Sequence, residues 1–215
     1  MKKRSGKTVR AKASSRARRS STRKAASGAG NTVFLVGFMG AGKSSVGRAL
    51  SQLLNWDFED LDDRIECRER RSVAEIFRES GEVQFRRAER DALQNILDDL
   101  RGGARVIALG GGAFAQENNA TLLQASNVPT VFLDAAVEEL WQRCSKQSEE
   151  AGAERPLLGS QAEFKKLYQA RRKSYKKASV MISTGNRSVE VIAAEIIKLL
   201  GLKKIETRVE EGEVE

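Results

Sequence analysis

One short stretch near the start of the chain limits its fold more than any other: GFMGAGKSS, residues 37–45. It matches the pattern G-x-x-x-x-G-K-[ST], whose fixed positions are here Gly37, Gly42, Lys43 and Ser44. The apolar run before it, TVFLVG (32–37), is typical of a buried strand, and SSVGRALSQLLN (44–55) after it has the apolar spacing of a helix. A glycine-rich loop between a strand and a helix indicates a site for the phosphates of a nucleotide.

Each fixed position of this loop has a physical task. The glycines let backbone N–H groups approach the phosphates closely, and the first turn of the following helix adds its positive end. Lys43 neutralises the β- and γ-phosphates, and Ser44 is a ligand for one Mg²⁺ ion. We therefore expect ATP or GTP to bind at a set of loop residues, namely Gly40, Ala41, Gly42, Lys43, Ser44 and Ser45.

Apolar runs and amphipathic helical patterns alternate between residues 32 and 201. The runs that predict strands are 32–37, 56–60, 105–112 (ending in a glycine turn), 129–134 and 179–184. The patterns that predict helices are 44–55, 61–69, 72–79, 82–101, 136–145, 163–177 and 188–201. This alternation indicates a P-loop three-layer α/β/α fold, with a five-stranded parallel sheet covered by helices on both faces.

Residues 147–160, QSEEAGAERPLLGS, separate two predicted helices. The segment is charged and contains glycine, and a loop of this length in a compact domain is usually disordered or a functional lid. We expect a mobile lid here.

Charge is concentrated at the start of the chain. Residues 1–30 hold 11 of the 38 Lys and Arg and none of the 29 Asp and Glu, which leaves 27 basic and 29 acidic residues elsewhere. With one large aliphatic residue after Met1, Val9, this leader cannot bury enough apolar surface to fold. We expect a disordered basic tail over 1–30, a P-loop domain over 31–202 and an acidic tail over 203–215.

The leader has two main interpretations. It lacks the apolar core of a secretory signal, but its Arg- and Ser-rich, acid-free composition also fits an organellar transit peptide. It has no amphipathic apolar face, and Lys2 and Lys3 directly after Met1 are unusual for such a peptide. We expect a retained tail on a cytoplasmic protein, with a plastid transit peptide or an added leader as alternatives. A retained tail would contact nucleic acid only weakly.

The chain has no His and two cysteines, Cys67 and Cys144. Neither cysteine has the spacing of a metal ligand, so zinc sites and His-based acid–base chemistry are excluded. No apolar run approaches the length that spans a membrane. We expect a monomeric protein of a reducing compartment, without membrane contact.

Glycines and acids after two strands point to the acceptor of the phosphoryl group. The strand RVIAL (105–109) ends in GGG (110–112), whereas nucleotide hydrolases need a strand that ends in an Mg²⁺-ordering Asp. The glycines either let a backbone approach something closely or form a simple turn. Asp60 and Asp62 follow the second strand, at the sheet edge where ligands bind, although they could also only cap the next helix.

Three arginines outside the leader are candidate ligands for negative charge: Arg86, Arg155 and Arg171. The planar fork of arginine suits a carboxylate or a transferred phosphoryl group, although each could instead lie on a solvated charged face. In EVQFRRAERDAL, one arginine of the pair must lie nearer the apolar stripe of Phe85 and Leu93.

Five stretches, taken together, resemble the shikimate kinase family. They are FLVGFMGAGKSSVGRAL, FEDLDDRIE, AEIFRESGEVQFRRAE, VIALGGGAF and ERPLL. They stand in the order and approximate spacing of that family over about residues 32–200, which leaves out both tails. The resemblance implies ATP-dependent phosphorylation of the 3-hydroxyl of shikimate, in the pathway to chorismate and the aromatic amino acids.

The resemblance also implies roles around the acceptor. Asp62 would hold the acceptor hydroxyl and take its proton, and Asp60 would reach Mg²⁺ through water. Arg86 and Arg171 would bind the shikimate carboxylate, and Gly111 would offer its backbone N–H. The reaction would then depend on positioning and charge neutralisation, with little covalent work for the protein.

Further implied roles concern the nucleotide. Arg155, in the lid, would close over the phosphates and act in catalysis together with Lys43 and Asp62, while Arg143 would stack on adenine. A closing lid would keep water from competing with the acceptor.

The chain departs from the family after the lid. The family usually has Arg-x-Pro-Leu-Tyr, and here residues 171–175 read RRKSY; Tyr175 keeps the register and selects Arg171 over Arg172. The segment TGNRS (184–188) lacks the usual proline, which leaves the adenine contacts open. Two alternatives also stay open: a gluconate-type small-metabolite kinase, and a non-catalytic nucleotide-binding relative that uses its basic tail on nucleic acid.

Overall fold

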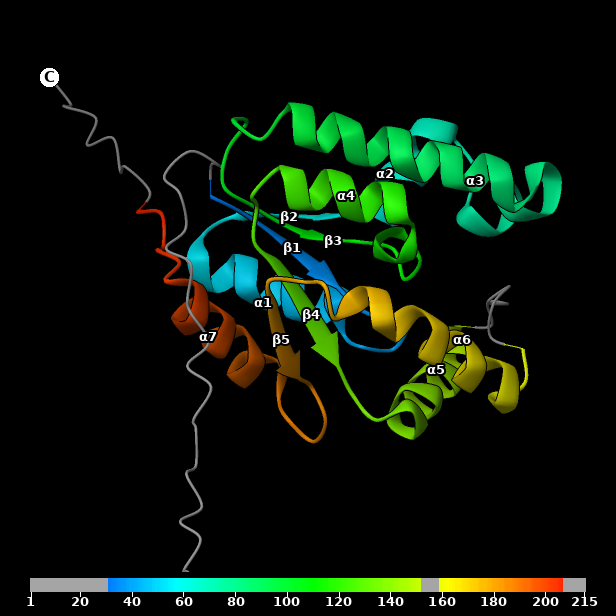
Figure 1. Ribbon diagram of the computed structural model, residues 1–215. Coiled ribbons are helices and arrows are strands. Elements are labelled where there is room, and N and C mark those ends of the chain that lie inside the picture. Colours follow the sequence, from blue (N-terminus) through cyan, green and yellow to red (C-terminus); the bar gives the residue numbers. More distant parts are fainter. Residues whose placement is uncertain (1–30, 152–158, 207–215) are drawn as a thin grey trace, which may run out of the picture.

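Five parallel strands form the centre of the computed structural model, which describes residues 31–151 and 159–206 (Figure 1). Their order across the sheet is β2 (Asp57–Asp60), β3 (Arg105–Ala108), β1 (Thr32–Val36), β4 (Thr130–Asp134) and β5 (Val180–Ser183). Every neighbouring pair is parallel. Strands β1 and β3 are buried along their whole length, as continuous apolar runs in a covered parallel sheet require.

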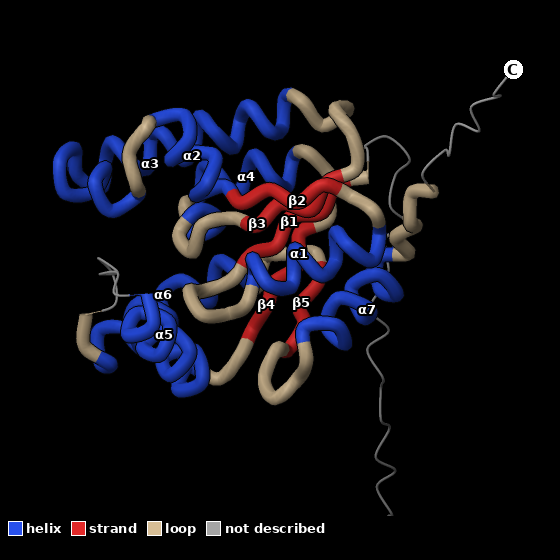
Figure 2. The backbone as a smooth tube through the Cα atoms, turned by 180° about the vertical axis from the view of Figure 1, so that it is seen from behind, coloured by secondary structure: helices blue, strands red, loops and turns tan. Residues whose placement is uncertain are grey.

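Seven α-helices surround the sheet within the described residues. They are α1 (Lys43–Leu54), α2 (Leu61–Glu69), α3 (Val73–Asp98), α4 (Glu117–Ala125), α5 (Val137–Ala151), α6 (Gln161–Tyr175) and α7 (Val189–Leu200). The crossover from β1 to β2 runs toward one edge of the sheet, whereas the next three crossovers run the opposite way. Right-handed crossovers therefore place α1 on one face and α3, α4 and α6 on the other. Figure 2 shows α1 beside α7, with which it packs.

The predicted α/β/α fold with a five-stranded parallel sheet is confirmed, and two stretches differ from expectation. A 3₁₀ turn (Ala113–Ala115) and helix α4 occupy a region for which the sequence predicted no element. Helix α4 is short, and its buried residues include the polar Asn119, so its apolar stripe is weak. Helix α5 continues to Ala151, through the first part of the expected lid, because Gln, Glu and Ala favour helix.

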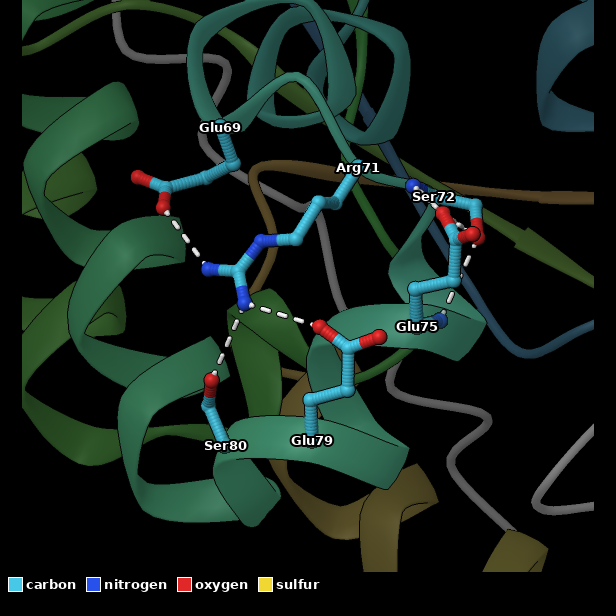
Figure 3. A network of polar contacts seen from close by, with 6 residues as sticks. All are labelled: Glu69, Arg71, Ser72, Glu75, Glu79 and Ser80. Atoms are coloured by element: carbon cyan, nitrogen blue, oxygen red, sulfur yellow. Dashed lines mark hydrogen bonds and ion pairs between the residues drawn. The ribbon is translucent and has the colours of Figure 1, made fainter.

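The corner between α2 and α3 is held by polar contacts (Figure 3). Ser72 caps α3: its Oγ accepts from the Glu75 N–H at 3.2 Å, and its own N–H donates to Glu75 at 2.7 Å. Arg71 joins Glu69 at the end of α2 to Glu79 on α3, at 3.5 and 3.3 Å. The two predicted helices 72–79 and 82–101 are the two parts of α3, which is kinked at Gly81.

The last described residues lie against the end of α1. The Ile205 N–H donates to the Leu54 carbonyl at 2.9 Å, and the Asn55 amide donates to the Ile205 carbonyl at 3.1 Å. The Trp56 indole N–H donates to the Lys203 carbonyl at 3.2 Å. The domain thus holds the chain beyond the expected boundary at residue 202, and the rest of the expected acidic tail lies outside the described residues.

Strand order also locates the ligand crevice. The chain leaves β1 toward one edge of the sheet and leaves its neighbour β3 toward the other, so the connections diverge at the carboxyl ends of these two strands. Ligands of open parallel sheets bind at such a point. The glycine-rich loop follows β1, GGG (110–112) follows β3, and Asp60 ends β2.

Among the helices of the described residues, none combines the length and the apolar composition of a membrane-spanning segment.

Candidate active site

The glycine-rich loop has a backbone shape that suits phosphate. Gly40 and Gly42 have φ values of 77° and 88°, the left-handed region that glycine adopts without strain. Lys43 Nζ donates to the carbonyls of Gly37 and Phe38 at 3.1 and 3.2 Å, so the lysine lies across its own loop. The N–H groups of the loop and the first turn of α1 thus converge with a cation, as anion binding requires.

Ser44 and Asp60 form a pair of hard oxygen ligands beside this loop. Ser44 Oγ donates to Asp60 Oδ2 at 2.7 Å, while Asp60 Oδ1 accepts from the Asp62 N–H at 3.1 Å and caps α2. Asp60 therefore both caps the helix and faces the phosphate loop. Mg²⁺ is usually held by one or two protein oxygens, with phosphate and water completing the shell. The pair fits that ion.

Asp62 is an acid of the cleft whose pKa is strongly raised. Burial and the neighbouring carboxylate of Asp60 raise its pKa from 3.8 to about 6, against the opposing effect of Lys43. Its Oδ1 atom is buried and has no hydrogen-bond partner within the described residues. A Cβ atom at Gly110 would lie 2.5 Å from that oxygen, so glycine is needed for the carboxylate to lie against the backbone.

Arg86 stands on α3 with its guanidinium over the last glycine of GGG. Its side chain is 15% exposed, and a Cβ atom at Gly112 would lie 2.6 Å from its Nη1. Glu89 accepts from this Nη1 with both oxygens, at 3.1 and 3.0 Å, and Glu82 accepts from the other side at 3.1 Å. The neighbouring Arg87 is exposed, so Arg86 is the member of the pair near the apolar stripe.

Glu89 is a buried acid of the smaller cavity that the sequence analysis did not select. It is fully buried, and burial raises its pKa to about 7, although the Arg86 charge pulls it down. A signal for it was available: residue 89 lies one turn after Phe85 on the buried face of α3, three residues after Arg86. An acid on a buried stripe beside an arginine indicates a residue that orients the guanidinium.

Arg171, on α6, completes the ring of groups around GGG. Its Nη1 donates to the Gly111 carbonyl at 3.2 Å, and Tyr175 donates its hydroxyl to the same carbonyl. Burial raises the pKa of the Tyr175 hydroxyl, which keeps it a neutral donor. Arg172 turns away and pairs with Asp134 at 2.6 Å. The geometry thus agrees with the choice of Arg171 over Arg172.

Two cavities meet at Asp62. The larger, about 360 Å³, is lined by the phosphate loop together with Ser44 and Asp60. The smaller, about 150 Å³, is lined by Arg86, Arg171 and the apolar side chains of Val73, Phe77 and Phe85. Residues shared by both walls are Met39, Asp62 and Gly111. A group bound in the small cavity can therefore meet a phosphate in the large one beside the Asp62 carboxylate.

A third cavity, about 180 Å³, lies behind the phosphate loop between Arg143 and Arg187. Arg143 donates to the Gly40 carbonyl at 3.3 Å and to the Thr184 carbonyl at 3.0 Å. These bonds connect α5 to the phosphate loop and to the segment that follows β5. The predicted site residues thus gather around one crevice, except for Arg155, which lies outside the described residues.

Comparisons with known proteins converge on one family. A family model described as "Shikimate kinase" matches residues 39–201. A shikimate kinase of Persephonella marina is 36% identical over 166 residues, covering 77% of this chain and 96% of that protein. A shikimate kinase of Brucella canis is also 36% identical, over 171 residues, 78% of this chain and 81% of the relative.

Solved structures of the same family are similar to this chain. The structure described as shikimate kinase from Acinetobacter baumannii in complex with shikimate has a TM-score of 0.72 and 32% identity, covering 82% of this chain and 96% of that chain. The shikimate kinase of Aquifex aeolicus has a TM-score of 0.67 and 35% identity, covering 79% and 96%.

Proposed function

This chain belongs to the shikimate kinase family, and from that premise we propose that it transfers the γ-phosphoryl group of ATP to the 3-hydroxyl of shikimate. The product, shikimate 3-phosphate, leads to chorismate and the aromatic amino acids. The observation that carries the assignment of roles is the position of Asp62, a buried carboxylate in the shared wall of the phosphate cavity and the cavity with two arginines.

The small cavity suits the acceptor. Arg86 and Arg171 present two planar forks to a carboxylate, and the apolar walls exclude water around a cyclic substrate. Glu89 and Glu82 fix the Arg86 guanidinium from two sides, so the carboxylate meets a donor that is already oriented. Gly111 offers its backbone N–H at the boundary with the phosphate cavity.

The larger cavity suits the triphosphate. The loop N–H groups and Lys43 neutralise the phosphates, and the charge that develops on the transferred group meets the same donors. Ser44 and Asp60 would hold Mg²⁺, Asp60 through water, and the ion would supply charge neutralisation between the β- and γ-phosphates. Arg143 would stack on adenine, and Arg155 would act over the phosphates from the lid.

Asp62 would hold and deprotonate the acceptor hydroxyl. A carboxylate with a pKa of about 6 is mostly ionised near neutral pH yet close enough to accept a proton in the transition state. Its buried Oδ1, which has no partner within the described residues, would accept a hydrogen bond from the substrate hydroxyl.

The monomeric state and the cytoplasmic location of the protein remain predictions.

Replacing Asp62 by Asn tests this role. The variant keeps the shape of the side chain and loses the base, so kcat should fall about 100-fold or more, the scale of general base catalysis. The Kd for ATP should stay unchanged. Asp63→Asn is the matched control, because Asp63 is the exposed neighbour on the same turn of α2. Near-normal turnover of Asp62→Asn would remove this residue from the mechanism.

A comparison of acceptors tests the reaction itself. ATP turnover should depend on shikimate and stay at background with gluconate or with no acceptor. Turnover with gluconate would favour a gluconate-type kinase, and nucleotide binding without turnover would favour a non-catalytic relative.

A further inference from the structure

A cavity of about 300 Å³ lies between α5 and α6, outside the active site. It shares no lining residue with the three cavities of the crevice. Its walls include Glu138 and Trp141 from α5 and Gln161, Phe164 and Lys165 from α6. Its volume falls at the lower end of the range of small-molecule sites. The proposed reaction gives it no task.

Two opposite charges stand at the rim of this α5–α6 cavity. Lys165 Nζ and Glu138 Oε1 are 3.6 Å apart, and their side chains are 54% and 62% exposed. An exposed pair of this length contributes little to stability, so each group can exchange its partner for a ligand charge. Gln161 and Ala162, in the first turn of α6, also line the cavity.

The inner wall is aromatic. Trp141 is half-buried, and its ring meets Phe164 edge-on, with centroids 5.2 Å apart and planes at 75°. Aromatic walls favour a flat apolar group, which gains both burial and ring contact. The cavity therefore combines a carboxylate, an ammonium and an aromatic surface within two adjoining helices.

We propose that the α5–α6 cavity binds a free aromatic amino acid. Its ammonium would pair with Glu138, its carboxylate with Lys165, and its ring would lie beside Trp141. A nucleotide or sugar phosphate would bring at least two negative charges against Glu138 for one lysine. A divalent cation beside Glu138 would lie close to the Lys165 ammonium, 3.6 Å from that carboxylate, and would be repelled by it.

Aromatic contacts connect this cavity to the phosphate loop. Phe164 meets the ring of Phe38 at 4.9 Å, and the Phe38 carbonyl accepts from Lys43. The Phe38 ring in turn lies 5.8 Å from the Arg171 guanidinium. A ligand that shifts Trp141 and Phe164 therefore shifts a residue of the nucleotide site. This step rests on the proposed function, and we expect bound ligand to change the KM for ATP or for shikimate.

Trp141 supplies the direct measurement. The chain has two tryptophans, so a Trp56→Phe variant reports on Trp141 alone, without ATP or shikimate. L-Phenylalanine should give a saturable fluorescence change, whereas 2-phenylethylamine and 3-phenylpropanoate, which lack one charge each, and L-alanine, which lacks the ring, should bind about tenfold more weakly or worse. Calorimetry on the unaltered chain repeats the titration without the substitution.

Charge variants locate the site. Glu138→Gln and Lys165→Gln should each weaken L-phenylalanine binding about fivefold or more, whereas Lys166→Gln, an exposed neighbour that does not line the cavity, should leave the Kd unchanged. No saturable binding up to about 10 mM, ten times a weak millimolar Kd, would overturn the proposal. Binding that ignores both charge variants would overturn it as well.

Kinetics then test the connection to the active site. With L-phenylalanine near saturation, the KM for ATP or shikimate should change by about fivefold or more, the lower end of typical couplings. Unchanged kinetics with proven binding would overturn the connection. Because binding is measured without turnover, a failure of the proposed enzymatic reaction would remain distinguishable from a failure of this site.

Discussion

At the scale of single residues, the acid at the centre of the crevice has opposite effects on activity and stability. The pKa of Asp62 rises from 3.8 to about 6 on folding. Between these two values the folded state binds more protons than the unfolded state, so the free energy of unfolding falls as pH rises through that range. The ionised carboxylate, which is the form that catalysis needs, therefore destabilises the fold at pH 7 by about 3 kcal/mol.

A pH series follows from this shift. Activity measured as kcat/KM should fall as pH drops through about 6, because Asp62 becomes protonated. Asp62→Asn should melt above the unaltered chain at pH 7.5, and the difference should shrink toward pH 4. Calorimetry measures the melting temperatures of both proteins. If Asp62→Asn melts below the unaltered chain at pH 7.5, the ionised Asp62 carboxylate does not destabilise the fold at that pH.

Arg86 is expected to matter through its shape rather than its charge. Arg86→Lys keeps the charge and loses the planar fork, so the KM for shikimate should rise tenfold or more, about 1.4 kcal/mol of lost binding. The Kd for ATP should change little. Arg87→Lys is the control, since Arg87 is exposed. An equal loss of ATP binding would assign Arg86 to the nucleotide or to the fold.

At the scale of elements, the glycine turn after β3 lets Asp62 on α2 and Arg86 on α3 lie close to its backbone. Added Cβ atoms at Gly110 and Gly112 would lie 2.5 Å from Asp62 Oδ1 and 2.6 Å from Arg86 Nη1. At Gly111 the nearest atom would be the Met39 backbone nitrogen, at 3.5 Å, an ordinary contact. The three neighbouring glycines are therefore not equivalent.

Alanine substitutions separate them. Gly110→Ala should lower kcat about tenfold or more by displacing the base, and Gly112→Ala should raise the KM for shikimate by displacing Arg86; a positional error of an ångström in a catalytic group has effects of that size. Gly111→Ala, which keeps its N–H, should stay near normal. Steady-state kinetics of the three variants give the answer, and equal losses would show that the turn acts only through its flexibility.

The elements also show why sequence reasoning reached the site but not all of it. The loop after β1, the acids after β2 and the glycines after β3 each carry a local signature, and parallel strands bring their carboxyl ends to one edge. Glu89 has only a weak sequence signal, its place on the apolar stripe of α3 beside Arg86, because its importance comes from burial beneath Arg86, a tertiary property. Helix α4 was missed because its burial depends on α3 and the turn before it rather than on a strong apolar stripe.

At the scale of the whole molecule, charge divides between the leader and the domain. The 11 cations of residues 1–30 face no acid within that segment, whereas the rest of the chain has a small acidic excess. Non-specific binding to a polyanion depends on such cations and falls steeply with salt. Among the described residues, those that line the two cavities of the active site all lie beyond Gly30.

Deletion of residues 1–30 should therefore separate two properties. The values of kcat and both KM should stay within about twofold, about 0.4 kcal/mol, while retention on heparin at low salt should be lost. Lost activity would mean that the leader contributes to the domain, and unchanged retention would mean that the domain carries a basic patch.

The two ends of the described chain lie on the side of the sheet away from the reaction. Asn31 precedes β1 and accepts from the Arg105 N–H at 2.7 Å, and Ile205 is held at the end of α1, beside the start of β2 (Figure 1). The crevice opens at the opposite, carboxyl ends of the strands. A carrier protein or solid support joined directly at residue 31 or residue 206 would therefore leave the opening for substrates facing the surrounding solution.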